Sequence, residues 1–188
     1  MLVHRTLWMM LSAGSLSGCE STYAFDPDPR PMLPNALLLL NAAEVRRRSL
    51  KLWSGIPNDV LGRKPDDSAM TCIEMVRHVL EGEYLYLTMI KARRSVPSEV
   101  TPFSLRPLVS VVDEVAFAQP HRDEFLALIE SFAPEQLATI EIDRTSDAGY
   151  KRRLGDFILR AAYHEAVHCG QLLANLRAMG VDRPNVWD

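Results

Sequence analysis

Apolar residues recur at helical spacing through much of the chain, beginning with the stretch between residues 34 and 56. Steps of three, four and seven place these apolar positions on one face of a helix. They are Leu38, Ala42, Val45, Leu52 and Ile56. The arginines at 46–48 are predicted to form the solvated side of this helix, or to face an anionic ligand. Gly55 and Pro57 mark its end.

Three further helices follow from local signals. Thr71 and Glu74 match the capping-box pattern, which predicts a helix from Thr71 to about residue 93. A third helix covers about 108–132, broken or kinked at Pro120. A fourth runs from about 152 to 179 and stops at Gly180. Residues 133–150 are expected to be irregular, with 139–143 briefly extended. The pattern predicts an all-α fold, a four-helix bundle over residues 33–188.

Composition indicates an ordinary globular domain and argues against a nucleic-acid-binding protein. Apolar residues make up 47% and charged residues 24% of the 188 residues, which is ordinary for one globular domain. The net charge of -3 argues against nucleic acid as a partner. Three cysteines without a CxxC pair fit a reducing compartment, so a cytoplasmic location is expected.

Residues 1–32 allow two interpretations. A short apolar run precedes Leu16-Ser17-Gly18-Cys19, and this order resembles a bacterial lipobox in which the cysteine would be lipidated. The chain would then be a membrane-anchored lipoprotein. The other interpretation is an ordinary N-terminal extension, with no membrane partner.

The chemistry of the chain centres on residues 163–171. His164 and His168 are four apart, so their imidazoles lie on one face of a helix and can offer nitrogens to one metal ion. His164-Glu165-Ala166-Val167-His168 also reads as HExxH, the zinc-peptidase signature, with Glu165 as general base. The peptidase interpretation is disfavoured because position 174, where its extended form needs a histidine, holds alanine.

A third ligand is better sought upstream. His78 lies on the second predicted helix among apolar neighbours, whereas His121 follows Pro120 in a polar segment and is interpreted as a surface or capping residue. Without a metal, the histidines would be hydrogen-bonded core residues. Cys169 is rotated about 100° from His168 and is interpreted as a packing residue.

The chain resembles the DinB/YfiT-like superfamily of metal-binding four-helix bundles over about residues 33–180. The resemblance rests on Thr71 and the segment 78–83 in the second helix, and on the segments 164–171 and 176–180 in the fourth. It implies that His78, His164 and His168 bind one divalent transition metal, zinc or nickel first, and that the chain forms a homodimer. Many relatives carry arginine where this chain has Cys169, so any role of that arginine is in doubt here.

The resemblance also implies an activity. Relatives include thiol-dependent S-transferases and isomerases, so a metal-dependent enzyme acting on a small thiol and an electrophile is expected. Glu165 is a candidate acid or base, with an interhelical salt bridge as the alternative. Each ligand histidine needs a partner for its second nitrogen. The candidates are Glu81, Glu83, Gln171 and Asn175. The alternative function is a stress-associated interaction module without catalysis, its metal structural or absent.

Overall fold

The structure is a computed structural model that describes residues 32–187, which form a mostly helical, all-α fold. The possible lipidation site at Cys19 and nearly all of the N-terminal segment lie outside the described residues. Four long helices make up most of the described part. They are α1 (Pro34–Ser54), α2 (Cys72–Ala92), α3 (Val111–Ser131) and α5 (Leu154–Ala178). None of the helices within residues 32–187 is long and apolar enough to cross a membrane.

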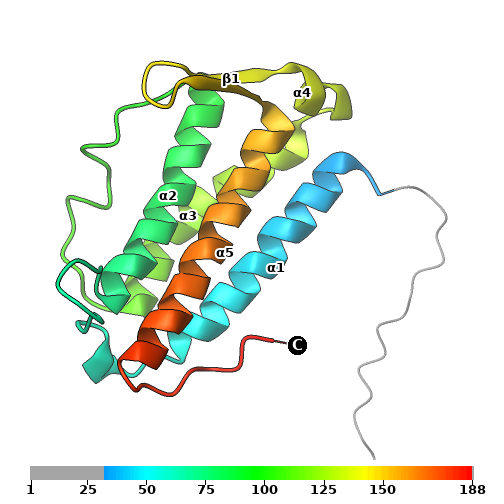
Figure 1. The fold of residues 1–188 in the computed structure, drawn as a ribbon. Helices are drawn as coiled ribbons and strands as arrows, with labels where there is room; N and C mark the ends of the chain where they lie inside the picture. Colours follow the sequence, from blue (N-terminus) through cyan, green and yellow to red (C-terminus); the bar gives the residue numbers. More distant parts are fainter. Residues whose placement is uncertain (1–31, 188) are drawn as a thin grey trace, which may run out of the picture. The chain divides into compact units, whose positions relative to one another are not determined.

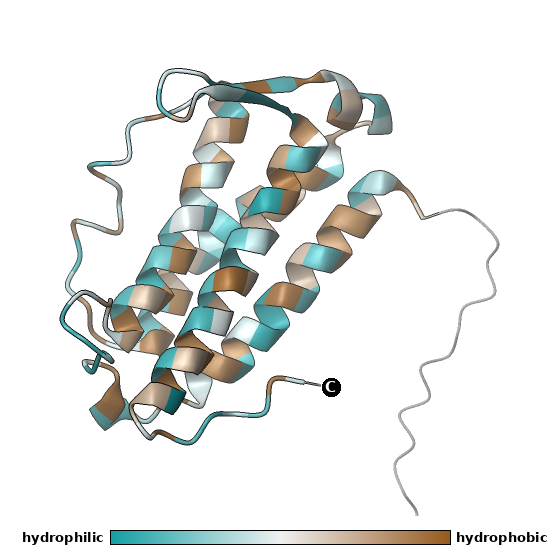
Figure 2. Ribbon diagram, in the orientation of Figure 1, coloured by the Kyte–Doolittle hydropathy of each residue, from teal (hydrophilic) through white to brown (hydrophobic). Residues whose placement is uncertain are grey.

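The four long helices lie side by side, with α5 between α1 and α2 and with α3 behind them (Figure 1). α1 and α2 each pack against both α5 and α3. Hydrophobic and hydrophilic residues are interspersed along each long helix (Figure 2), and the residues that each helix buries are mostly apolar. Between α1 and α2 the chain forms a short 3-10 helix, Asn58–Val60.

The helix ends follow the predicted local signals. The Thr71 hydroxyl accepts from the Glu74 amide, and the Glu74 carboxylate accepts from the Thr71 amide, so the predicted capping box is confirmed. α5 ends before Gly180, whose φ of +69° is a left-handed conformation that glycine adopts without a Cβ clash. α3 continues through Pro120, which is exposed, so a break there is wrong, while a kink stays a prediction.

The segment predicted to be irregular is in fact ordered. It contains the short helix α4 (Pro134–Thr139) and the antiparallel strands β1 (Glu141–Arg144) and β2 (Tyr150–Arg153). The Gln136 side chain accepts from the Ala133 amide at 2.8 Å and caps α4. Only the run at 139–143 was expected to be extended, because β2 is highly polar and is defined by its pairing with β1.

Two hydrophobic clusters fill the interior at opposite ends of the long helices. One contains Leu52, Trp53, Val76 and Leu172, and the other contains Leu38, Leu87, Phe125, Ile129 and Phe157. A layer of charged side chains separates them, with one residue from each long helix. These residues are Arg46 of α1, Glu83 of α2, Arg122 of α3 and Glu165 of α5, all less than 9% exposed.

Arg46 links three helices within this layer. Its Nε and Nη2 donate to the two carboxylate oxygens of Glu165 at 2.8 and 3.0 Å, and Nη2 also donates to Glu83 at 3.2 Å. Arg122 donates to Glu83 and, at 2.8 Å, to the carbonyl of Ala42. Two arginines thus balance two glutamates. The prediction that the arginine run is solvated is wrong for Arg46, because periodicity cannot reveal buried acidic partners on other helices.

The layer yields a stability prediction. Burial by itself lowers the pKa of Arg46, but the charges and hydrogen bonds of Glu165 and Glu83 outweigh burial and raise it. We expect Arg46→Met to lower the free energy of unfolding by about 3–5 kcal/mol, because it leaves buried carboxylates without their cation. Urea titration of the purified variant measures this loss.

Arg47→Met is the matched control. Arg47 pairs with Glu44 at 2.9 Å, and both side chains are nearly half exposed, so its loss should cost less than about 1 kcal/mol. Equal losses for the two variants would contradict a structural role for the buried layer.

Candidate metal centre

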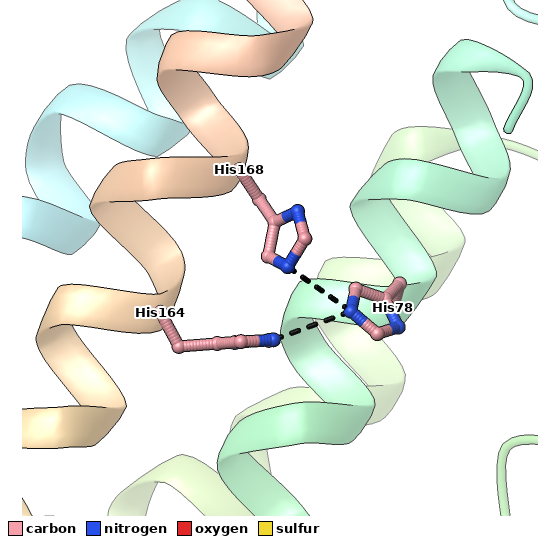
Figure 3. Close-up of side chains that lie close together, drawn as sticks. All are labelled: His78, His164 and His168. Carbon is pink, nitrogen blue, oxygen red and sulfur yellow. Dashed lines mark hydrogen bonds between the residues drawn. The ribbon is translucent and has the colours of Figure 1, made fainter. Parts of the chain in front are cut away.

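Three histidines converge between α2 and α5. His164 and His168 extend from α5 toward His78 on α2 (Figure 3). The His78 Nε2 lies 3.1 Å from Nε2 of His168 and 3.2 Å from Nε2 of His164. In the part of the chain that the structure describes, these three form the group of candidate metal-ligating residues, with one ligand atom of each within 4.8 Å of the others.

The spacing suits a single metal ion. Two nitrogens bound to a tetrahedral zinc at about 2.0–2.1 Å are separated by about 3.3 Å, close to the two Nε2–Nε2 distances from His78. All three side chains are half-buried, so the site is accessible from one side. The i, i+4 spacing in α5 brings His164 and His168 onto one face, and α2 contacts α5 along that face.

Burial and neighbouring imidazoles keep His78 and His164 neutral. Burial, followed by the proximity of His168 and His78, lowers the pKa of His164 to about 4. Burial and then His168 also lower the pKa of His78. Both imidazoles are therefore uncharged at neutral pH, the state in which a ring nitrogen has a lone pair for a metal.

Gln171 orients one member of the triad. Nδ1 of His168 lies 2.7 Å from Oε1 of Gln171, one turn further along α5. An Nδ1–H that donates to this oxygen leaves the lone pair of His168 on Nε2, which faces His78. Gln171 thus occupies the position predicted for a residue that orients a ligand.

The other predicted partners have different surroundings. Glu81 accepts from the hydroxyl of Thr101, and its charge opposes the lowering of the His78 pKa. Glu83 is engaged by Arg46 and Arg122 in the buried layer. Asn175, half-buried on α5, accepts through its main-chain oxygen from the amide of Met179 at 3.0 Å.

Glu165 points into the helical core. It is 4% exposed, and both of its oxygens accept from Arg46. This geometry corresponds to the interhelical salt bridge and leaves no oxygen free of Arg46. The peptidase role of a general base is thus disfavoured further, because the carboxylate is buried and both of its oxygens are engaged by Arg46.

The structure also shows the surroundings of two residues outside the triad, Cys169 and His121. Cys169 contacts Ser49 through its thiol at 3.0 Å, and burial raises its pKa to about 11, consistent with packing rather than reactivity. His121 lies among Tyr84, Phe103 and Phe117, with ring centroids 4.8 to 6.0 Å away. It is therefore an aromatic packing residue and not a capping residue.

A pocket of about 200 Å³ opens beside the triad. Its wall includes His78 and His164, together with the apolar side chains of Leu85, Tyr86 and Met89. The loop after α2 and the β1–β2 hairpin supply the remaining wall. The lining residues there are Val96, Ser98, Arg144 and Asp147. Sequence reasoning did not find the contribution of the hairpin, because nothing in its local pattern places it beside His164.

Gly82 allows the close approach of α2 to His164. A Cβ at position 82 would lie 2.6 Å from Cε1 and 3.0 Å from Nδ1 of His164, so the imidazole would have to shift. We expect Gly82→Ala to weaken zinc binding about tenfold or more by displacing this ring, measured by competition with a chromophoric chelator.

Gly170→Ala provides the control on α5. A Cβ at Gly170 meets nothing within 4 Å, so this change should leave zinc affinity unchanged and stabilise the helix by about 0.5–1 kcal/mol. Unaltered affinity in Gly82→Ala would show that the ring position is not important for binding.

The lowered pKa values predict a pH dependence for the metal-free protein. Unfolded histidine titrates near pH 6.5, whereas folded His164 titrates near pH 4. Between these values the unfolded chain binds more protons, so stability should fall as the pH is lowered from 6.5 toward 4. Urea unfolding of chelator-treated protein at several pH values measures the slope.

His164→Leu should flatten this slope in the window above pH 5, where carboxylates contribute least. His121→Leu removes a histidine outside the triad, so this variant should keep the dependence of stability on pH. A slope that is the same in wild type and His164→Leu would contradict the assignment.

Comparisons with known proteins agree with the fold. The model of the family described as the DinB superfamily matches residues 41–172, a range that includes all three histidines. A relative from Bacillus subtilis (strain 168), "Uncharacterized protein YjoA", is 30% identical over 130 residues, covering 69% of this chain and 80% of the relative. The crystal structure of a DinB-like protein, YjoA from Bacillus subtilis, has a TM-score of 0.53 at 22% identity, covering 79% of this chain and 92% of that one.

Proposed function

The chain belongs to the DinB superfamily, and on that premise we propose that it is a divalent-metal-dependent enzyme built on a four-helix bundle of the DinB/YfiT-like type. His78, His164 and His168 are the proposed ligands. The observation that carries the proposal is the convergence of their Nε2 atoms beside a pocket. Three neutral imidazoles leave a coordination position for a substrate, as in catalytic metal sites.

The metal is proposed to be zinc or nickel. Imidazole nitrogens suit zinc, nickel, copper and iron, and in cells metal availability decides among them. Three uncharged ligands leave the full charge of the ion uncompensated. When bound, such an ion lowers the pKa of a thiol or water and polarises a substrate.

The proposed reaction is thiol transfer or a thiol-dependent isomerisation, with a low-molecular-weight thiol and an electrophile as substrates. In a transfer, the thiol loses its proton to solvent water, its sulfur forms a bond to the electrophilic carbon, and the bond from that carbon to the leaving group breaks, so that the leaving group departs with the bonding electrons. Leu85, Tyr86 and Met89 give the pocket an apolar wall on the side of α2. Gln171 keeps His168 in the orientation that ligation needs.

Glu165 is proposed to position α5 instead of transferring a proton, since Arg46 engages both of its oxygens. Formation of a homodimer and a cytoplasmic location stay predictions from the sequence.

Metal content gives the first test. Untagged protein purified without chelator should carry about one transition metal per chain by elemental analysis. His78→Ala should lose most of this metal, since two imidazoles rarely hold a divalent ion against competing ligands. His121→Ala should keep it, because His121 lies outside the triad. A wild-type chain that lacks metal and takes up neither zinc nor nickel would contradict the proposal.

Turnover separates the enzyme from the interaction module. The metal-loaded protein is assayed with a panel of small thiols and electrophiles, and activity should disappear in His78→Ala. Metal binding without turnover across the panel would favour the non-catalytic module. Activity that persists in His78→Ala would contradict the metal-dependent mechanism.

A further inference from the structure

The pocket beside the triad has a cationic side chain in its wall. Arg144 is the last residue of β1, and its guanidinium donates to the carboxylate of Asp147 in the hairpin turn. Arg144 and Asp147 both line the pocket, together with the apolar residues of α2. An arginine at the edge of an apolar pocket is suited to fix the orientation of a ligand.

One N–H group of the Arg144 guanidinium makes no hydrogen bond within residues 32–187. This group is the Nε–H, and its nitrogen is buried. A buried N–H without a partner costs free energy, which a ligand that accepts a hydrogen bond recovers only when the side chain turns this N–H toward the pocket. Asp147 shows how such a ligand would bind, because a carboxylate already pairs with the same guanidinium from a turn that is largely exposed.

The surroundings of Arg144 carry excess positive charge. Arg152 pairs with Asp156 at 2.7 Å, and Arg160 reaches the other oxygen of Asp156 at 3.6 Å. Arg144 and Arg152 both lie against the ring of Tyr150, at 5.9 and 4.5 Å. Three guanidinium groups therefore share two paired carboxylates in this cluster, which leaves one positive charge.

The positive charge of this cluster acts on Tyr86, which lines the pocket. Burial, and then Tyr150, raises the pKa of the Tyr86 hydroxyl, while Arg144, Arg160 and Arg152 act in the opposite direction. The three arginines thus lie within electrostatic range of a residue of the pocket wall. The Tyr86 ring is also 6.2 Å from the ring of His164, so the cationic cluster and the triad flank the same residue.

We propose that the pocket binds a small substrate with a single carboxylate group, which Arg144 anchors while the rest of the molecule lies along Leu85 and Met89 toward His78 and His164. This inference rests on the proposed function and narrows its substrate class. A carboxylate matches the planar donor array of Arg144. It also matches the single excess positive charge of the surrounding cluster, which comes from Arg152 and Arg160 sharing Asp156. A phosphate carries up to about two negative charges and matches less well.

The pocket also limits the size of the substrate. Its volume of about 200 Å³ lies below the ~300–1,000 Å³ typical of pockets for drug-sized ligands. A molecule of about the size of an amino acid is therefore expected, and a large conjugate would have to extend out of the pocket.

Butyrate and butyramide form a test pair of nearly equal shape that differs in charge. Binding of each is followed by NMR chemical shifts of 15N-labelled full-length protein, both metal-free and loaded with zinc. We expect wild type to bind butyrate about tenfold more tightly than butyramide, since a hydrogen bond to a charged group is the stronger one. The metal-free sample removes direct ligation of the carboxylate to zinc as a cause.

Arg144→Gln should reduce this preference to within about twofold, and Arg144→Lys should keep part of it. Lys151→Gln is the matched control, because Lys151 lies on the same hairpin, pairs with Asp143 at 3.1 Å and does not line the pocket. It should keep the full preference. Thermal unfolding verifies that each variant is folded. If Arg144→Gln does not fold, Arg144→Lys tests the role of the guanidinium as an anchor.

Three results would overturn the inference: no binding of butyrate, equal binding of the two compounds by wild type, or a preference that survives in Arg144→Gln. Failure of the proposed function is distinguishable from these. A chain that binds no metal but prefers butyrate through Arg144 would contradict the metal-dependent enzyme and retain the anion site. A chain that binds metal but does not prefer butyrate would contradict the anion site and leave the metal-dependent enzyme in place.

Discussion

A neutral layer of buried charges holds the four long helices at one level. Arg46, Glu83, Arg122 and Glu165 come from four different helices, and each is nearly inaccessible to water. Burying any one of them without its partners would be strongly unfavourable, so the helices must meet in the arrangement that satisfies all four. Hydrophobic packing above and below the layer tolerates small shifts, whereas hydrogen bonds of about 3 Å define the relative heights of the helices.

The candidate metal centre depends on this alignment. His164 precedes Glu165 in α5, so the helix presents the carboxylate to α1 and the imidazole to α2, about 100° apart. On α2, Gly82 precedes Glu83 and leaves room for the imidazole of His164. The residues that fix the helices and those that form the site therefore alternate along the same turns. A shift of α5 by one residue would disrupt both.

The site combines properties that favour a metal and a small polar substrate. Burial keeps the imidazoles of His78 and His164 neutral, Gln171 fixes the orientation of His168, and the apolar side chains of α2 line one side of the pocket. The hairpin adds Arg144 at the edge of the pocket. In this arrangement the long helices supply the proposed ligands, and the β1–β2 hairpin supplies the polar part of the pocket wall.

The sequence by itself determined the all-α class, the approximate extent of the long helices, the capping box at Thr71 and the pairing of His164 with His168 on one helix face, whereas the family resemblance joined His78 to them. These features depend on periodicity and on contacts within a few residues, which the order of amino acids specifies directly. Only the tertiary structure decided the burial of Arg46, the engagement of Glu165 and Glu83 by arginines, and the place of Arg144 beside the triad. Each of these depends on partners from other elements, 37 to 119 residues apart in the buried layer, and no local pattern encodes that proximity.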